Sequence, residues 1–454
     1  MNETRRKAAI RSGLRLLAAG MLFGSVLLTR CADEGAKTPS IVIITLDTTR
    51  ADHLGFGGYE RKTSPNLDRL AADATVYTQA YSTASTTLPA HASLFTGKFV
   101  TGHGARRDRG GPLRLLDAID GPEQWSAYRA RGLAPDERTL ASLLAEAGYE
   151  TGAVVAGPWL KKVFGLHRGF QFYDDAGIGT VNGRPAERVT ASGLSWLKEN
   201  RDRPFCLFLN YFDPHAPYMA PEPFLGSFVS TGGSGRPVSR NALLVARYDA
   251  EILYMDHHIG ALLQKLDEWD LYDETWIIVT ADHGELLGEH ELLGHGKQLY
   301  EEEIRVPLIS KLPHGEGAGE RIDDRVQLTD LLPMICARLG LRLPPGIEGA
   351  ARARPIIAET YPNEFISSRG HWRALIAGDF KFLWNSKEKH LLFNLEEDPA
   401  EASDLSAERP ELAAKMHRLL ESYLQSLPEP GEAGPPVQVD GEITEALKRL
   451  GYVK

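Results

Sequence analysis

The sequence predicts an α/β protein: a large domain with a mostly parallel sheet flanked by helices, followed by a smaller C-terminal domain. From Ile41 onward, short apolar runs alternate with helical patterns, which is the arrangement of an α/β domain. Three of the apolar runs end in a carboxylate residue, and ligands bind beyond the carboxyl ends of strands in such sheets. Near residues 344–348 the chain becomes rich in proline and glycine, which indicates a domain boundary.

These patterns divide the chain into four expected segments: a signal peptide or anchor with a linker (1–38), the large domain (39–345), the C-terminal subdomain (346–428), and a linker with a terminal helix (429–454). In the first segment, basic residues between Arg5 and Arg15 precede the apolar run Leu16–Leu28, which is typical of a secretory signal. This run is shorter than the ~20 residues that a membrane-spanning helix needs. We therefore expect export to the periplasm or cell envelope. Membrane attachment through this segment, including a lipid anchor at Cys31, is an alternative to a cleaved signal.

The predicted elements of the large domain follow in chain order. Strands are expected at Ile41–Leu46, Thr151–Ala156, Phe205–Tyr211, Trp276–Thr280 and Val306–Ile309, and helices at Leu140–Ala147 and Tyr248–Trp269. The segment Arg109–Ala134 fits neither pattern and is interpreted as an insertion over the site. In the C-terminal subdomain, strands are expected near Ala374–Ala377 and Lys381–Trp384, with a helix at Glu411–Leu424.

The composition excludes some classes of function. The chain has 454 residues, of which 43% are hydrophobic, so it can bury a sizeable core. Its formal net charge of −10 argues against a nucleic-acid-binding protein, which normally carries a basic face. The same charge gives no long-range attraction for an anionic substrate, so anion affinity must come from a local site. Cys206 and Cys336 lie in apolar patterns, so neither a disulfide framework nor a thiolate zinc site is expected.

Acidic residues follow three of the predicted strands. Asp47 ends the first strand, Asp213 follows the third, and Asp282 with His283 follows the fourth. Each aspartate alone has a simpler interpretation as a turn residue or helix cap. An Asp-His pair at the end of an apolar strand is harder to explain in that way, because both side chains would be partly buried and need a partner. The spacing therefore predicts a metal site at this edge of the sheet.

The segment Ser85–Gly97 combines a hydroxyl residue with a helix start. Thr87 is followed by Pro89 near the first helical turn, and Gly97 is a typical helix end. Thr87 would therefore lie at a helix N-terminus, where free backbone N–H groups and the helix dipole favour an anion. The alternative is that Thr87 only caps the helix, and this segment alone does not exclude it.

Several blocks together resemble the sulfatase family of the alkaline phosphatase superfamily. They lie in the family's order along nearly the whole chain, and they read IVIITLDTTRAD at 41–52, TLPAHASLFTG at 87–97, DPHAP at 213–217, TADHGELLGEH at 280–290 and FNLEEDPAEASDL at 393–405. The resemblance implies a mixed, mostly parallel sheet flanked by helices, and a smaller C-terminal domain with antiparallel strands and a helix. It also implies roles for seven residues: metal ligation by Asp47, Thr87, Asp282 and His283, and catalysis by Thr87, His215, His295 and Lys297.

The departures from the family pattern bear on the chemistry. Sulfatases convert a cysteine or serine to formylglycine, and Thr87 is neither, so no formylglycine is expected. His91 stands where the resemblance places an arginine, and Thr48 replaces a second acidic ligand. The segment Ala156–Trp159 lacks the lysine and histidine that many sulfatases have there. Direct attack by a threonine hydroxyl suits phosphoryl transfer, while the family as a whole favours sulfate esters.

The resemblance leaves the cofactor and the activity open in part. One divalent cation is expected, calcium before magnesium or manganese, because the strand-end ligands are mostly oxygen donors. A two-zinc site completed by Asp213, His215 and His295 is the alternative. The expected activity is hydrolysis of a sulfate or phosphate ester of a small molecule, glycan or lipid. A phosphodiesterase or phosphotransferase, or a non-catalytic metal-binding homologue, are the competing interpretations.

Overall fold

The computed structural model describes residues 38–229, 239–350, 354–361 and 370–427. The part of the chain from Pro39 onward forms one compact unit. The predicted export segment with Cys31 and the predicted terminal helix lie outside the described residues. Among the described helices, none is long and apolar enough to cross a membrane. The predicted boundary between residues 345 and 346 stays a prediction.

The described residues form one large sheet of nine strands, in the order β13-β2-β12-β9-β1-β8-β6-β7, with β14 also paired to β2. The strands are β1 (Ser40–Leu46), β2 (Thr75–Tyr81), β6 (Glu150–Val154), β7 (Phe172–Asp174), β8 (Phe205–Tyr211), β9 (Thr275–Thr280), β12 (Arg305–Lys311), β13 (Arg321–Ile322) and β14 (Val326–Gln327). Only β12 runs antiparallel to its neighbours, β9 and β2. The sheet is therefore mixed and mostly parallel, as expected.

The centre of the sheet is the parallel trio β9-β1-β8. Ile43 of β1 lies opposite Phe208 of β8 on one side and Ile278 of β9 on the other. All seven residues of β8 are buried, and so are six of the seven in β1. Strands covered by helices on both faces need such continuous apolar runs, which is why these strands were predictable from sequence.

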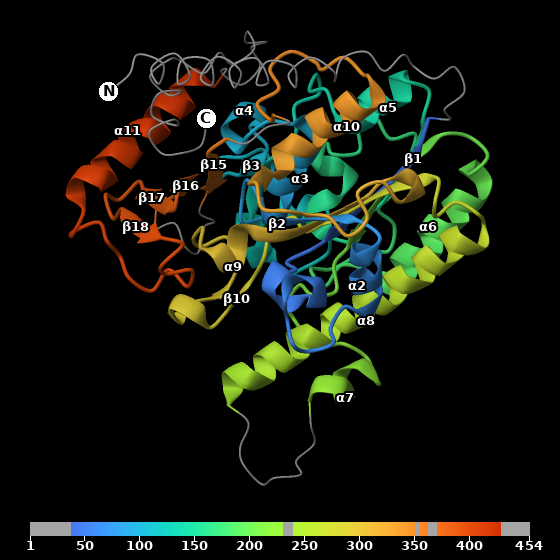
Figure 1. Cartoon of the computed structure of the whole chain (residues 1–454), viewed down its shortest axis with the longest axis horizontal. Coiled ribbons are helices and arrows are strands. Elements are labelled where there is room, and N and C mark those ends of the chain that lie inside the picture. The colour runs from blue at the N-terminus through green and yellow to red at the C-terminus, as the bar shows by residue number, and fades with distance from the viewer. Residues whose placement is uncertain (1–37, 230–238, 351–353, 362–369, 428–454) are drawn as a thin grey trace, which may run out of the picture. The chain divides into compact units, whose positions relative to one another are not determined.

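Helices cover both faces of this sheet. They are α2 (Pro65–Ala72), α3 (Thr87–Thr96), α4 (Val100–His103), α5 (Leu140–Glu146), α6 (Ala186–Asn200), α7 (Phe224–Phe228), α8 (Arg240–Glu268), α9 (Glu301–Ile304) and α10 (Leu331–Leu339). Figure 1 shows α3, α5 and α10 on one face of the sheet and α2, α6 and α8 on the other. Helix α8 begins earlier than the predicted Tyr248, because the Ser239 side chain accepts a hydrogen bond from the Ala242 N–H and caps the helix.

The C-terminal part is a four-stranded antiparallel sheet with one helix. It contains β15 (Ile356–Thr360), β16 (Trp372–Ala377), β17 (Phe380–Asn385), β18 (Leu391–Asn394) and α11 (Pro410–Ser426). Phe99, which precedes α4, packs into the apolar cluster under α11 with Phe382 and Tyr423. A second cluster joins Tyr81 of β2 to Trp372. These contacts attach the C-terminal sheet to the large sheet and to α4.

The segment Arg109–Ala134, which fitted no pattern in sequence, contributes to a small sheet and short 3₁₀ turns. The sheet has the order β3-β5-β4, with β3 at Arg106–Arg107, β4 at Leu113–Arg114 and β5 at Arg129–Arg131. A further pair, β10 (Leu286–Leu287) and β11 (Leu293–Gly294), follows β9. Strands of two or three residues are too short to produce a recognisable alternation of apolar and polar side chains.

Candidate metal and catalytic site

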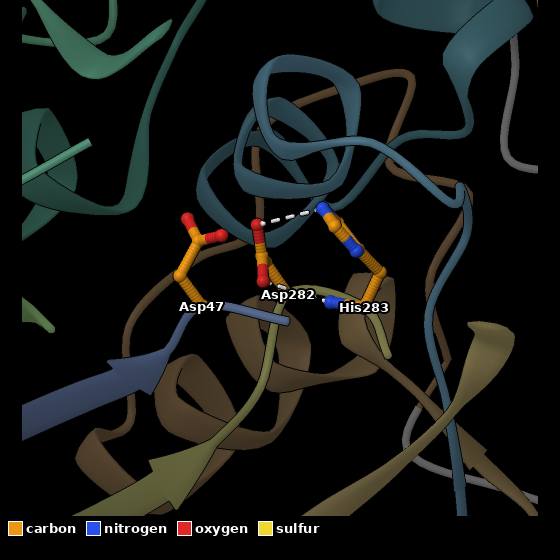
Figure 2. Close-up of side chains that lie close together, drawn as sticks. All are labelled: Asp47, Asp282 and His283. Carbon is orange, nitrogen blue, oxygen red and sulfur yellow. Dashed lines mark hydrogen bonds and ion pairs between the residues drawn. The ribbon is translucent and has the colours of Figure 1, made fainter. Parts of the chain in front are cut away.

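Three strand ends meet at one edge of the large sheet. Because β9, β1 and β8 are adjacent and parallel, the residues that follow them gather at the same edge. Asp47 follows β1 directly, and Asp282 and His283 follow β9. All three are fully buried, and one ligand atom from each lies within 4.8 Å of the others. Figure 2 shows the carboxyl groups of Asp47 and Asp282 beside each other, with the His283 ring next to the Asp282 carboxyl group.

Three of the four carboxyl oxygens of this cluster lack hydrogen-bond partners among the described residues, whereas Asp282 Oδ1 accepts from the Thr48 and His283 N–H groups. Among the described residues, neither side-chain oxygen of Asp47 has a hydrogen-bond partner, and Asp282 Oδ2 has none either. Burial, followed by the charges of Asp282 and Glu285, raises the pKa of Asp47 well above its ordinary value. Buried carboxylates without partners are costly, and a cation between them removes that cost. The residues present therefore fit a bound cation.

His283 presents a free lone pair to the same point. Its Nδ1 lies 2.9 Å from the Gly284 carbonyl oxygen and must donate to it, so Nε2 is unprotonated. Nε2 lies 3.4 Å from Asp282 Oδ2 and 3.4 Å from Thr87 Oγ1. Burial lowers the pKa of His283 well below its ordinary value, which keeps the ring neutral. A lone pair facing a carboxylate oxygen is unfavourable unless a cation lies between them.

Thr87 lies at the first position of α3, beside this cluster. The residue before it, Thr86, is the N-cap and its side chain makes no capping hydrogen bond. The Thr87 hydroxyl instead points to His283, so the interpretation of Thr87 as a simple helix cap is wrong. Helix α3 is buried along its whole length and ends at Gly97, whose φ is +67°. Its N-terminal N–H groups therefore face a desolvated site.

His91 connects α3 to β1. Its Nδ1 donates to the Thr87 carbonyl oxygen at 2.9 Å, and its Nε2 accepts from Thr45 Oγ1 at 3.0 Å. The ring is fully buried, and burial lowers the pKa of His91. A neutral imidazole therefore stands where the family resemblance places an arginine. It holds the start of α3 in place but brings no positive charge to the site.

Two further histidines predicted from sequence lie next to His283. The His295 ring centroid is 4.6 Å from that of His283 and 5.1 Å from that of His215. His295 Nδ1 lies 3.0 Å from Glu285 Oε1 and donates to it, which leaves Nε2 unprotonated. Burial lowers the pKa of both His215 and His295 to about 3. Sequence reasoning missed Glu285, whose only signal was its place two residues after His283.

The remaining predicted residues lie outside the cation cluster. The Lys297 ammonium donates to the Leu293 carbonyl oxygen, although its charge also lowers the pKa of His295. Asp213 accepts a hydrogen bond from the Ala186 N–H at 2.9 Å, and burial raises its pKa to about 7. The cluster itself therefore comprises Asp47, Asp282 and His283, with the Thr87 hydroxyl beside them.

Comparisons with known proteins identify the family and agree with the fold. The sulfatase family model matches residues 39–341. The chain is 24% identical to an uncharacterised sulfatase of Escherichia coli K12, over 87% of this chain and 88% of the relative. It is 23% identical to an arylsulfatase of Clostridium perfringens, over 81% and 90% of the two chains. The phosphonate monoester hydrolase of Agrobacterium radiobacter has the same fold, with a TM-score of 0.69 at 20% identity, over 86% and 96%.

Proposed function

We propose that this chain, which belongs to the sulfatase family, hydrolyses its ester with the Thr87 hydroxyl as the direct nucleophile. Membership of the family makes it a sulfate or phosphate ester hydrolase. The position of Thr87 supports its proposed role as the nucleophile. Its hydroxyl lies at the N-terminus of a buried helix, 3.4 Å from His283 Nε2, in a site where three of the four oxygens of Asp47 and Asp282 lack hydrogen-bond partners among the described residues.

One divalent cation is proposed to bind Asp47, Asp282 and His283, together with the Thr87 hydroxyl. When bound, the cation lowers the pKa of a hydroxyl ligand and polarises the oxygens of the ester. The two carboxylates suit calcium, magnesium or manganese, and calcium stays our first expectation. The imidazole nitrogen is a ligand that also suits zinc, so zinc belongs in the test, as does the two-zinc alternative with Asp213, His215 and His295.

His295 is proposed to move the proton. Its Nε2 takes the proton of the Thr87 hydroxyl while Thr87 Oγ forms a bond to sulfur or phosphorus and the bond to the leaving oxygen breaks. The proton then passes to the leaving oxygen, so that an alcohol departs. Water next attacks sulfur or phosphorus and gives up a proton, while the bond to Thr87 Oγ breaks. That proton passes to Thr87 Oγ, so the hydroxyl is restored and sulfate or phosphate departs. The hydrogen bond from Nδ1 to Glu285 supports this role, because a carboxylate stabilises the imidazolium.

In the free site, burial lowers the pKa of His295. The negative charge of an ester bound next to His295 raises this pKa again. His215 and Lys297 are proposed to contact the anionic group of the ester. The free N–H groups at the start of α3 face the same place and favour an anion. The organic part of the substrate is proposed to be a small molecule, glycan or lipid, reached after export of the chain.

The test is an activity panel on the full chain, with wild type beside Thr87→Ala and Thr87→Ser. Each protein is chelated, supplied with calcium, magnesium, manganese or zinc, and offered an aryl sulfate, an aryl phosphate and a phosphodiester. Cation-dependent cleavage that is lost in Thr87→Ala and kept in Thr87→Ser supports the proposal. Equal cleavage by Thr87→Ala contradicts it. Cation binding without any cleavage favours the non-catalytic homologue.

A further inference from the structure

We infer that Arg107 binds an oxygen of the substrate's anionic group and so supplies the positive charge that position 91 lacks. The inference rests on the proposed function, because it assigns the recognition of the sulfuryl or phosphoryl group at that same site. Arg107 lies on β3, in the segment just before the insertion over the site, and it carries no assigned role in the family resemblance described above.

The Arg107 guanidinium lies at the wall of the histidine cluster. A methyl group placed on Gly296, which directly follows His295, would lie 3.4 Å from Arg107 Nη1. Burial, and after it the charge of the nearby Arg107, lowers the pKa of His295. The guanidinium carbon Cζ of Arg107 also lies 5.7 Å from the ring centroid of Trp159, so this ring contacts one side of the guanidinium.

The charge of Arg107 is not neutralised within the described part of the chain. The side chain is half-buried, and no described carboxylate forms an ion pair with it. Other enclosed arginines differ in this respect: Arg50 pairs with Asp52 at 2.7 Å, and Arg184 pairs with Asp174 at 3.0 Å. An enclosed charge without a partner costs stability. A ligand anion is the partner that such a charge can acquire at this site.

The other side chains that could carry positive charge at this site differ from Arg107. His91 is fully buried and held neutral between Thr87 and Thr45. The Lys297 ammonium donates one hydrogen bond to the Leu293 carbonyl oxygen and offers the anionic group a point charge. A guanidinium presents a planar fork of N–H donors, which matches two oxygens of a tetrahedral sulfuryl or phosphoryl group. Arg107 is thus the cation best placed and best shaped to bind the group that Thr87 attacks.

Binding is measured in the full chain carrying Thr87→Ala, so that the ester is not consumed. With the cation supplied, titration calorimetry with 4-nitrophenyl sulfate and 4-nitrophenyl phosphate compares this parent with added Arg107→Met or Arg107→Lys. A charge-assisted contact of ~1.5–3 kcal/mol corresponds to an affinity loss of about 10- to 150-fold in Arg107→Met. Arg107→Lys should recover part of that loss. Arg106→Ala is the matched control, because the Arg106 guanidinium lies 4.5 Å from the Tyr361 ring centroid and binds there.

A second readout separates binding from a structural role. Because Arg107 is enclosed without a partner, Arg107→Met should keep or raise the melting temperature of the ester-free protein, whereas a structural arginine would lower it. Unchanged affinity in Arg107→Met, or a melting temperature that falls well below that of Arg106→Ala, overturns the inference. So does a parent that binds neither ester. Arg107-dependent binding in a chain whose wild type shows no turnover keeps the inference and contradicts only the nucleophilic role of Thr87.

Discussion

At the residue scale, the buried carboxyl group of Asp47 is the reason why we propose a cation at this site. Both of its oxygens lack hydrogen-bond partners among the described residues, and Asp282 lies next to it. In water each oxygen would be solvated, so burial without compensation opposes folding. A bound cation would offset this unfavourable burial. We therefore predict that cation binding raises the free energy of unfolding through Asp47.

We expect Asp47→Asn to remove this coupling. At a cation concentration of 100 times its Kd, wild type should gain about 2.7 kcal/mol of unfolding free energy, and the variant almost none. In chelator, the variant should be at least as stable as wild type, because one buried charge is gone. Calorimetric melting with and without cation measures both effects. Asp52→Asn is the control, since the Asp52 side chain is 65% exposed and pairs with Arg50. An equal response to cation in Asp47→Asn would contradict this account.

The sequence was sufficient to predict the residues of the buried cluster but not their surroundings. Asp47, Asp282 and His283 were predictable because each follows a continuous apolar run, and parallel strands bring their ends together. Glu285 and Arg107 were not, because their roles depend on how the chain after β9 and the strand β3 fold back over the site. No local pattern encodes such a contact between distant segments.

At the scale of elements, hydrogen bonds join the end of helix α3 to the loop that follows α10. The N–H of Glu348 donates to the Gly97 carbonyl oxygen at 2.9 Å, just where α3 ends. The Glu348 carboxyl group accepts from the Phe99 N–H, and its other oxygen has no partner among the described residues. Burial raises the pKa of Glu348 to about 8 from an ordinary value of 4.5. The group is therefore protonated in the fold at neutral pH.

This raised pKa predicts a pH-dependent stability. The folded state binds a proton that the unfolded state releases above pH 4.5, so the contribution of Glu348 is fully present below pH 4.5 and is lost as pH rises towards about 8. The loss approaches but does not exceed about 1.4 kcal/mol per pH unit. Urea unfolding of Glu348→Gln between pH 5 and 8 should show a shallower decline than wild type. Glu146→Gln, an exposed control, should follow wild type. Parallel slopes for all three proteins would contradict the assignment.

The elements themselves were predictable to different degrees. Strands β1, β8 and β9 were identified from their apolar runs, whereas β2 was missed because its middle residues are half-buried and polar or aromatic. The antiparallel direction of β12 was not predicted, because side chains alternate in the same way in parallel and antiparallel strands; the family resemblance implied only that the sheet is mixed.

At the scale of the whole molecule, a buried lysine joins the C-terminal sheet to the large domain. Lys381 of β17 is fully buried and lies 3.0 Å from Glu301 of α9 and 2.9 Å from Glu401. The Glu301 N–H also donates to Glu401. The same three residues thus connect α9, which follows the site loop, with β17 and the segment after β18.

Removing this lysine should uncouple the two parts. Lys381→Met leaves the buried Glu401 and the partly buried Glu301 carboxyl groups without their cation. Loss of one member of such a cluster costs about 3–5 kcal/mol. Equilibrium unfolding in urea measures the loss. Lys265→Met is the control, because the Lys265–Glu268 pair is exposed and its loss should cost less than about 1 kcal/mol. Similar stability losses in the two variants would contradict the proposed role of Lys381.

Direct attack by Thr87 is the central claim, and trapping the covalent intermediate tests it most directly. The full chain is mixed with cation and an aryl phosphate or aryl sulfate, quenched in acid during turnover, digested, and analysed by peptide mass spectrometry. We expect a phosphoryl or sulfuryl group on Thr87 in the wild-type peptide and no such group on the corresponding peptide of Thr87→Ala. Turnover with an unmodified Thr87 peptide at every quench time, or with the group on another residue, would contradict it.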